Sequence, residues 1–199
     1  MANKFYDILR APHQVAFDIT NNCNLRCLHC FNSSGENDVI SNELSDGEVL
    51  HFIEDLASMN LYNVCFCGGE TLLRKELMCE CIKILKPSGS HCTAVTNGLL
   101  ANPATIQQLA SAGLDGIQFS LDGLRDSHER LRNKVGIFPK VIDAMKYVLN
   151  ETGLRLSIAF TPTSFNVKDF LGVYDLLVDL YEKSNRTTGS DYIDFRLQP

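Results

Sequence analysis

The stretch ITNNCNLRCLHCFN, residues 19–32, places Cys23, Cys27 and Cys30 in a CxxxCxxC pattern. Thiolates are soft ligands that favour zinc or iron–sulfur centres. Structural zinc sites and 4Fe–4S clusters both usually take four protein ligands, yet the sequence has no second CxxC. Because His29 is adjacent to Cys30, simultaneous ligation by both would be awkward. Three cysteines would leave one metal position open, which is how metal sites act on substrates.

The bulk composition is that of one ordinary globular domain. The chain has 199 residues, 45% of them hydrophobic, and a net charge of −6. It has no basic tract, which argues against binding to a nucleic-acid backbone. The sequence contains no apolar run long enough for a membrane span and no apolar signal-peptide region at its start. We expect neither a nucleic-acid partner nor a membrane partner.

Eight cysteines in one chain raise the question of disulfide bonds. A disulfide scaffold is typical of short secreted chains, and this chain is neither short nor visibly secreted. We therefore expect a reducing compartment, the cytoplasm. Five cysteines lie outside the CxxxCxxC pattern, and for most of them we expect small buried hydrophobic residues. These are Cys65, Cys67, Cys79, Cys81 and Cys92.

Strand-like and helix-like patterns alternate along the chain. Strands are predicted at 14–20, 63–67, 92–96, 116–121, 155–161 and 192–197. Helices are predicted at 45–59, 72–86, 102–113, 138–151 and 166–184, with a short one near 125–132. Predicted helix starts include a capping box of Ser45 with Glu48, and Asn102 and Asn166 as N-caps.

This alternation predicts an α/β fold with a parallel sheet and right-handed crossovers. A closed eightfold barrel needs about 250 residues, so six strands fit a partial (β/α)6 barrel of the TIM type that is open or truncated after the sixth strand. We expect residues 1–199 to form one domain. The sequence stops at Pro199, directly after the sixth strand, so we also expect the natural protein to continue beyond it.

Five of the six predicted strands have one bulky apolar face and one small or polar face. In the second strand, for example, Val64 and Phe66 point one way while Cys65 and Cys67 point the other. A packed barrel interior would be filled by Val, Ile and Leu. We interpret the small or polar face as the wall of a solvated or ligand-filled cavity.

Polar motifs follow four successive strands at the edge where parallel α/β proteins place their sites. They are the cysteine stretch, CGGET at 67–71, TNG at 96–98 and SLDG at 120–123. Glycines let a backbone approach a ligand closely, and a carboxylate suits a cationic group. Each turn alone is ordinary. Together on one edge they predict a binding site.

In order and spacing, the CxxxCxxC loop, GGE and SLDG resemble the radical S-adenosylmethionine (radical SAM) superfamily. The subgroup most similar is that of peptide- and protein-modifying maturases, which often continue into a SPASM-type domain with auxiliary clusters. No such domain follows here. The resemblance implies a 4Fe–4S cluster on Cys23, Cys27 and Cys30, with SAM chelating the open iron. An electron from a donor such as flavodoxin or ferredoxin would cleave SAM to methionine and a 5′-deoxyadenosyl radical, which would abstract hydrogen from a peptide or protein.

The resemblance also implies a role for the glycine turn. Gly68, Gly69 and Glu70 would receive the amino group of SAM, and Asn97 of the TNG motif would be a further cofactor contact. Thr71 stands where the family commonly has proline, which changes the stiffness of the turn more than its chemistry.

Further positions are implied by the same resemblance. Ser120 and Asp122 would face the ribose and the methionine end of SAM, and Arg132 would pair with the SAM carboxylate. His29 takes the place of the usual aromatic residue before the third cysteine and would lie beside the adenine. Leu197 would pack against the adenine from the sixth strand. No catalytic acid or base is assigned.

Three alternatives stay open at the level of sequence. The cysteines could belong to a non-catalytic zinc or iron–sulfur module, although such a module would not need GGE and SLDG. The chain could be a truncated core that binds cluster and SAM without turning over substrate. Cys67 could supply a fourth ligand, which would block chelation by SAM.

Overall fold

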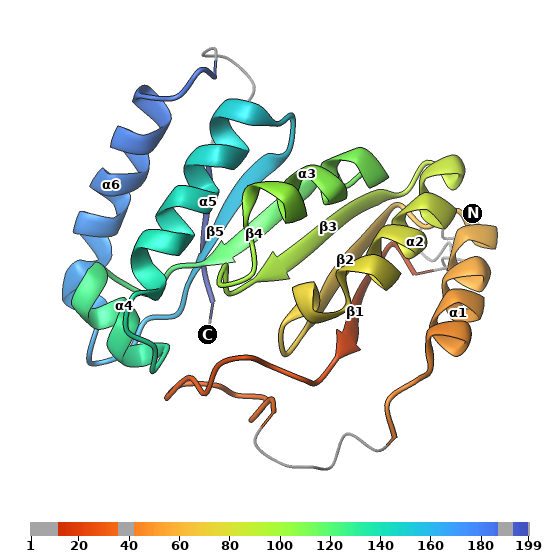
Figure 1. Ribbon diagram of the computed structural model, residues 1–199, viewed down its shortest axis with the longest axis horizontal. Helices are drawn as coiled ribbons and strands as arrows, with labels where there is room; N and C mark the ends of the chain where they lie inside the picture. The colour runs from red at the N-terminus through yellow and green to blue at the C-terminus, as the bar shows by residue number, and fades with distance from the viewer. Residues whose placement is uncertain (1–11, 36–41, 187–192, 199) are drawn as a thin grey trace, which may run out of the picture.

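Six parallel strands form one sheet in sequence order in the computed structural model, which describes residues 12–35, 42–186 and 193–198. Each strand pairs with the next one along the chain, and β1 and β6 form the two edges (Figure 1). The strands are β1 Gln14–Thr20, β2 Asn63–Gly68, β3 His91–Thr96, β4 Gly116–Ser120, β5 Arg155–Phe160 and β6 Asp194–Leu197. The predicted open, parallel α/β sheet is confirmed.

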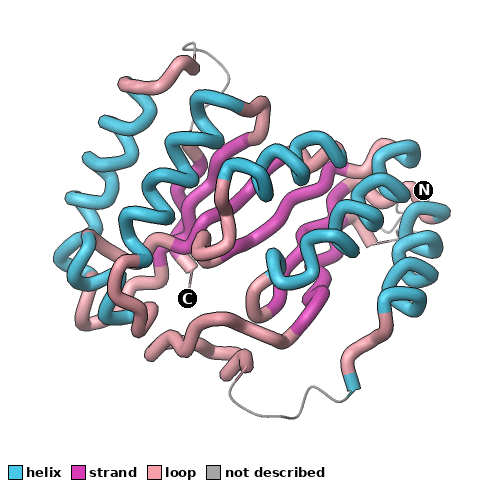
Figure 2. The backbone as a smooth tube through the Cα atoms, in the orientation of Figure 1, coloured by secondary structure: helices cyan, strands magenta, loops and turns pink. Residues whose placement is uncertain are grey.

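The helices cover one face of this sheet (Figure 2). The α-helices are α1 Asp46–Ser58, α2 Lys75–Leu85, α3 Pro103–Ala112, α4 Arg125–Leu131, α5 Ile137–Glu151 and α6 Phe170–Glu182. Three short 3₁₀ turns are η2 Thr71–Arg74, η3 Lys86–Ser88 and η4 Val167–Asp169. Within the part of the chain that the structure describes, no helix has the length and apolar character needed to cross a membrane.

The two faces of the strands differ as predicted. The side chains of Val64, Phe66 and Phe119 are completely buried beneath the helices. On the opposite face of β2, Cys65 and Cys67 are only half-buried. The apolar core therefore lies between sheet and helices, and the inner face of the sheet is left for polar and small side chains.

Two predicted helix starts are confirmed by their caps. Ser45 and Glu48 form the predicted capping box at α1, and the side chain of Asn102 accepts a hydrogen bond from the backbone N–H of Thr105 at α3. The starts of two other helices, α2 and α6, differ from the prediction. The segment after Glu70 begins as the 3₁₀ turn η2, because the Glu70 carboxylate binds the N–H of Leu72.

Asn166 is not the N-cap of the last helix, and this prediction was wrong. Its side chain makes no cap bond, and the chain passes through η4 before α6 begins at Phe170. Instead, the amide Nδ2 donates to the carbonyl oxygens of Asp122 and Thr161 at 2.7 and 2.8 Å. Residue 192, the first residue of the predicted sixth strand, lies outside the described residues.

Candidate cofactor site at the carboxyl edge of the sheet

The cysteine loop lies at the carboxyl edge of the strands, directly after β1 (Figure 1). A cavity of about 180 Å³ opens there. Its wall contains all three cysteines of the pattern and most of the predicted cofactor residues, namely Cys23, Cys27, Cys30, His29, Gly68, Gly69, Asn97, Ser120 and Arg132. Residues from four strand ends and Arg132, which directly follows α4, thus meet at one place, as the sequence predicted.

The three thiols face this cavity without being bound to one another. Burial raises the pKa of Cys23 and of Cys27. Asn97 Nδ2 lies 3.9 Å from the sulfur of Cys23, and Arg132 Nη1 lies 3.7 Å from the sulfur of Cys27. These donors would favour the thiolate form that binds metal.

A single metal ion does not fit the described side chains. Nowhere in residues 12–35, 42–186 and 193–198 do three His, Cys, Asp or Glu side chains group so that they could hold one ion. In an iron–sulfur cluster each cysteine ligates a different iron, so the sulfurs need not converge on one point. Three thiols around one cavity are therefore compatible with an iron–sulfur cluster.

The glycine turn after β2 is bound directly to the cysteine loop. The N–H of Gly69 donates to the carbonyl of Thr20 at 2.8 Å, and the N–H of Glu70 donates to the carbonyl of Asn22 at 2.8 Å. A Cβ on Gly68, whose φ is +134°, would lie 2.2 Å from the Thr20 oxygen, and a Cβ on Gly69 would lie 2.3 Å from the Asn22 oxygen. Only glycine permits this approach.

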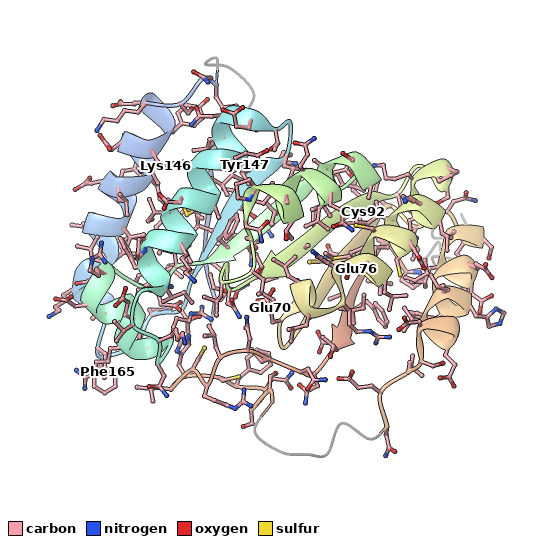
Figure 3. All side chains as sticks on the ribbon, viewed as in Figure 1. Glu70, Glu76, Cys92, Lys146, Tyr147 and Phe165 are labelled. Carbon is pink, nitrogen blue, oxygen red and sulfur yellow. The ribbon has the colours of Figure 1, made fainter. Side chains whose placement is uncertain are left out.

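Glu70 connects the glycine turn to the TNG turn after β3. Its carboxylate is 1% exposed and accepts three hydrogen bonds, from Leu72 N at 3.0 Å, Thr96 Oγ1 at 2.7 Å and Asn97 N at 2.8 Å. Burial raises its pKa, although these donors oppose the shift. Figure 3 shows Glu70 at the end of the strands, above the cysteine loop. It lies behind the wall of the cavity rather than in it.

Asp122, Arg132 and His29 form a buried charge cluster beside the cavity. Asp122 is completely buried and lies 2.6 Å from Arg132 Nη2 and 3.3 Å from His29 Nε2. Burial alone would raise the pKa of Asp122, but Arg132 and His29 hold it well below its usual range. Arg132 therefore bridges the carboxylate of Asp122 and the sulfur of Cys27.

Two nitrogen atoms of this cluster have no hydrogen-bond partner among the described residues. They are Nε of Arg132 and Nδ1 of His29, both buried, and both residues line the cavity. Arg132 Nε is always a donor, and a buried donor without a partner costs roughly 1–3 kcal/mol. The site therefore fits a polar ligand that would accept a hydrogen bond from Arg132.

The family of the chain is assigned from its sequence. Residues 17–177 match the radical SAM superfamily, which is most of the chain. The chain belongs to the radical SAM superfamily. Members of this superfamily are enzymes that use a 4Fe–4S cluster and SAM.

Two curated relatives illustrate the range of the superfamily. The Fe-coproporphyrin III synthase of Methanosarcina barkeri is 32% identical over 163 residues, covering 82% of this chain and 40% of that protein. The mycofactocin maturase MftC of Mycolicibacterium smegmatis is 29% identical over 192 residues, covering 94% of this chain and 47% of that protein. The chain thus spans less than half the length of either relative.

A solved radical SAM structure has the same fold. Streptococcus suis SuiB bound to S-adenosylmethionine superposes with a TM-score of 0.72 and 17% identity, covering 94% of this chain and 51% of SuiB. At this identity the likeness shows the fold alone. The superposition agrees with the partial barrel predicted from the alternation of strands and helices.

Three residues predicted from the radical SAM resemblance do not line the cavity, namely Glu70, Asp122 and Leu197. Leu197 is 61% exposed and lies on the same face of β6 as Phe195, which packs against Phe160 and Phe170 on the helical side. Its neighbour Gln198 lines the cavity instead. The geometry therefore does not support a contact between Leu197 and a ligand held over the cysteines.

Two buried residues that support the radical SAM site were not predicted for this role. His128 Nδ1 accepts a hydrogen bond from the N–H of Asp122 at 3.1 Å, and Asn166 binds the carbonyl of Asp122 at 2.7 Å. His128 does lie within the HERLR segment that suggested Arg132. Asn166 is 44 positions from Asp122, and no local signal reveals that contact.

A larger groove lies elsewhere, between α3 and α5. It measures about 660 Å³ and is lined by residues such as Lys140, Lys146 and Tyr147, of which Figure 3 labels the last two. No cysteine borders it. The smaller cavity at the cysteine loop is therefore the candidate site, because the metal-ligating groups are there.

Proposed function

We propose that this chain is the catalytic core of a radical SAM enzyme that modifies a peptide. Cys23, Cys27 and Cys30 each ligate one iron of a 4Fe–4S cluster, and the fourth iron is left for SAM. The observation that carries this proposal is the meeting of three thiols and the glycine turn around one cavity with an unpaired buried donor, Arg132 Nε. A structural metal site would need neither the turn nor that donor.

Different residues of the chain hold different groups of SAM. Gly68 and Gly69 line the cavity and offer backbone acceptors for the ammonium group. The free Nε of Arg132 meets the carboxylate, while Asp122 fixes the guanidinium. Ser120 lies on the wall where the ribose is proposed to bind.

The remaining predicted residues act at the borders of the site. Asn97 holds Cys23 in place, and Glu70 keeps the glycine turn against the TNG turn. His29, which lies on the cavity wall, is the proposed neighbour of the adenine. When bound, cluster and SAM supply a 5′-deoxyadenosyl radical that removes hydrogen from a substrate. The protein orients the reactants and excludes water.

The peptide substrate is supported by the mycofactocin maturase, whose similarity extends over 94% of this chain. A porphyrin ligand is the second candidate, favoured by the 32% identity to the Fe-coproporphyrin III synthase, whose name gives a porphyrin as its product. Absorbance titration with Fe-coproporphyrin III separates the two. Saturable binding near the site would favour a porphyrin, and its absence is expected for a peptide-modifying enzyme. We also propose a cytoplasmic location and a flavodoxin- or ferredoxin-type electron donor.

Anaerobic reconstitution tests the proposed function. We expect about four irons per chain, and release of 5′-deoxyadenosine from SAM when dithionite is added. The variant Cys30→Ala should lose both, because it removes a ligand. The variant Cys79→Ala, which removes a buried thiol of the core, should keep both. One zinc per chain without cleavage of SAM would reject the proposal.

A further inference from the structure

The five cysteines outside the loop separate into two groups. Cys79, Cys81 and Cys92 are at most 5% exposed and belong to the hydrophobic core, as predicted for most of the five. Cys65 and Cys67 differ, because both are half-buried and lie on the inner face of β2. Their sulfurs are 3.5 Å apart. Two thiols in contact on an open face require an explanation other than packing.

The register of the sheet places this pair next to the candidate cofactor site. Cys67 is paired with Asp18 of β1, and Cys65 with Thr93 of β3. When the pairing of Cys65 with Thr93 is continued along β2 and β3, Cys67 lies beside Val95. Val95 lines the cavity, and so does Gly68, which follows Cys67 in β2. The dithiol therefore lies on the inner face, directly behind the cavity wall.

The surroundings of the pair allow its two sulfurs to share one proton. The contact between the two thiols lowers the pKa of Cys65 and raises the pKa of Cys67. Thr93 and Arg196 also favour the thiolate of Cys65, while Asp18 opposes it. The arrangement keeps one thiol protonated beside a neighbour that is ready to ionise.

We propose that Cys65 and Cys67 form a redox-active dithiol that donates a hydrogen atom to a carbon radical generated in the neighbouring cavity. This inference rests on the proposed function, since that function supplies the radical. The S–H bond of Cys67 breaks homolytically and a C–H bond forms on the radical, leaving a thiyl radical. Because an S–H bond is weaker than an alkyl C–H bond, the transfer is downhill.

The second cysteine stabilises the product of this transfer. The sulfur of Cys65, in contact with Cys67, shares the unpaired electron of the thiyl radical. One electron from the low-potential iron–sulfur or flavin donor protein and one proton from solvent then restore the thiol of Cys67. Atoms and electrons balance, and no bond to Cys65 is left behind. A lone thiol would lack this stabilisation, which explains why the structure holds a pair.

Thiol reactivity in the cofactor-free chain gives the first test. Isotopically labelled iodoacetamide, added in limiting amount and followed by peptide mass spectrometry, reports which thiols react first. We expect Cys65 to be alkylated several-fold faster than Cys79, Cys81 and Cys92, and faster than in the Cys67→Ala variant, which leaves no hydrogen-bond donor at position 67. Equal rates for Cys65 and the buried cysteines would contradict the geometry on which the proposal depends.

Deuterium labelling gives the second test. The reconstituted chain is freed of small thiols, transferred to D₂O and given SAM and titanium(III) citrate without substrate. An exchanged S–D group on Cys67 should deliver deuterium to the 5′-deoxyadenosyl radical, so that mass spectrometry finds singly deuterated 5′-deoxyadenosine. The deuterated fraction should fall several-fold in Cys67→Ala, and at least as far in the double variant Cys65→Ala/Cys67→Ala, which also removes the second exchangeable thiol of the pair. The Cys79→Ala variant should retain the wild-type fraction.

The outcomes separate this inference from the proposed function. Absence of 5′-deoxyadenosine in every variant would contradict the proposed function. Formation of 5′-deoxyadenosine with the same deuterium content in wild type, Cys67→Ala and Cys65→Ala/Cys67→Ala would overturn the dithiol proposal alone. Iron content and visible spectrum, measured on each variant, show that the cluster is intact when the isotope ratio is read.

Discussion

At the scale of single residues, buried polar groups hold the site together. Glu70 and Asp122 are both almost inaccessible, and each is satisfied by partners far away in sequence. The sequence predicted that these carboxylates matter but assigned both directly to SAM. It could not show that Thr96 and Arg132 already bind them, because such contacts depend on how the strand ends are brought together. Their roles toward SAM stay a proposal.

His128 provides a prediction at this scale. It is completely buried, and burial together with Arg132 lowers its pKa to about 3. In the unfolded chain the pKa is about 6.5, so the unfolded state binds the extra proton first. The stabilising contribution of neutral His128 is thus present above pH 6.5 and is lost as pH falls toward 3. The slope is about 1.4 kcal/mol per pH unit.

The variant His128→Asn tests this slope, because its Oδ1 can still accept from the N–H of Asp122 but does not titrate. Urea unfolding of the iron-free chain should show the wild type losing about 2 kcal/mol more than the variant between about pH 7 and about pH 5. His51→Asn is the control, since the His51 side chain is 79% exposed. Parallel pH profiles for wild type and His128→Asn would show that His128 is not buried in its neutral form.

At the scale of elements, the sequence predicted those features that depend on neighbouring residues. Strand alternation, the capping box at Ser45 and the cap at Asn102 are all local, and each is confirmed. The predictions for the start of α2 and the role of Asn166 were wrong. The start of α2 is displaced by the local bond between Glu70 and Leu72, whereas the role of Asn166 is decided by a bond to a distant segment. The glycine turn was predicted in part. Its residues were recognised as a site, but its attachment to the cysteine loop was not foreseen.

That attachment leads to a prediction about Gly69. In the variant Gly69→Ala, the new Cβ would meet the backbone carbonyl oxygen of Asn22 at 2.3 Å. Relief requires displacement of the cysteine loop, and overpacking of this kind costs roughly 1–3 kcal/mol. We expect lower thermal stability and incomplete reconstitution with iron.

The control for this prediction is Gly47→Ala in α1, where a Cβ would meet nothing within 4 Å. This variant should bind iron like the wild type and lose no stability, since alanine is the better helix former. If Gly69→Ala reconstituted as fully as Gly47→Ala, the close contact between turn and loop would not be what positions the cysteines.

At the scale of the whole molecule, an open parallel sheet leaves its inner face accessible while the helices protect the core. The cavity, the dithiol and the ends of four strands all lie on that inner side or its carboxyl edge. Alternation in the sequence predicted this division of faces, because side-chain parity is a local property. The sequence could not show whether Cys65 and Cys67 have different roles, or whether one of them is a fourth metal ligand. Both questions depend on distances between strands.

The central claim is that three cysteines leave one iron of a cluster open for SAM. Electron paramagnetic resonance of the reduced, reconstituted chain tests it most directly, with spectra recorded before and after addition of SAM. We predict a clear shift of the cluster signal on addition of SAM, in the wild type and also in Cys67→Ala with its iron retained. An unchanged wild-type spectrum, or loss of the cluster in Cys67→Ala, would contradict the claim, because the fourth iron would then have a protein ligand.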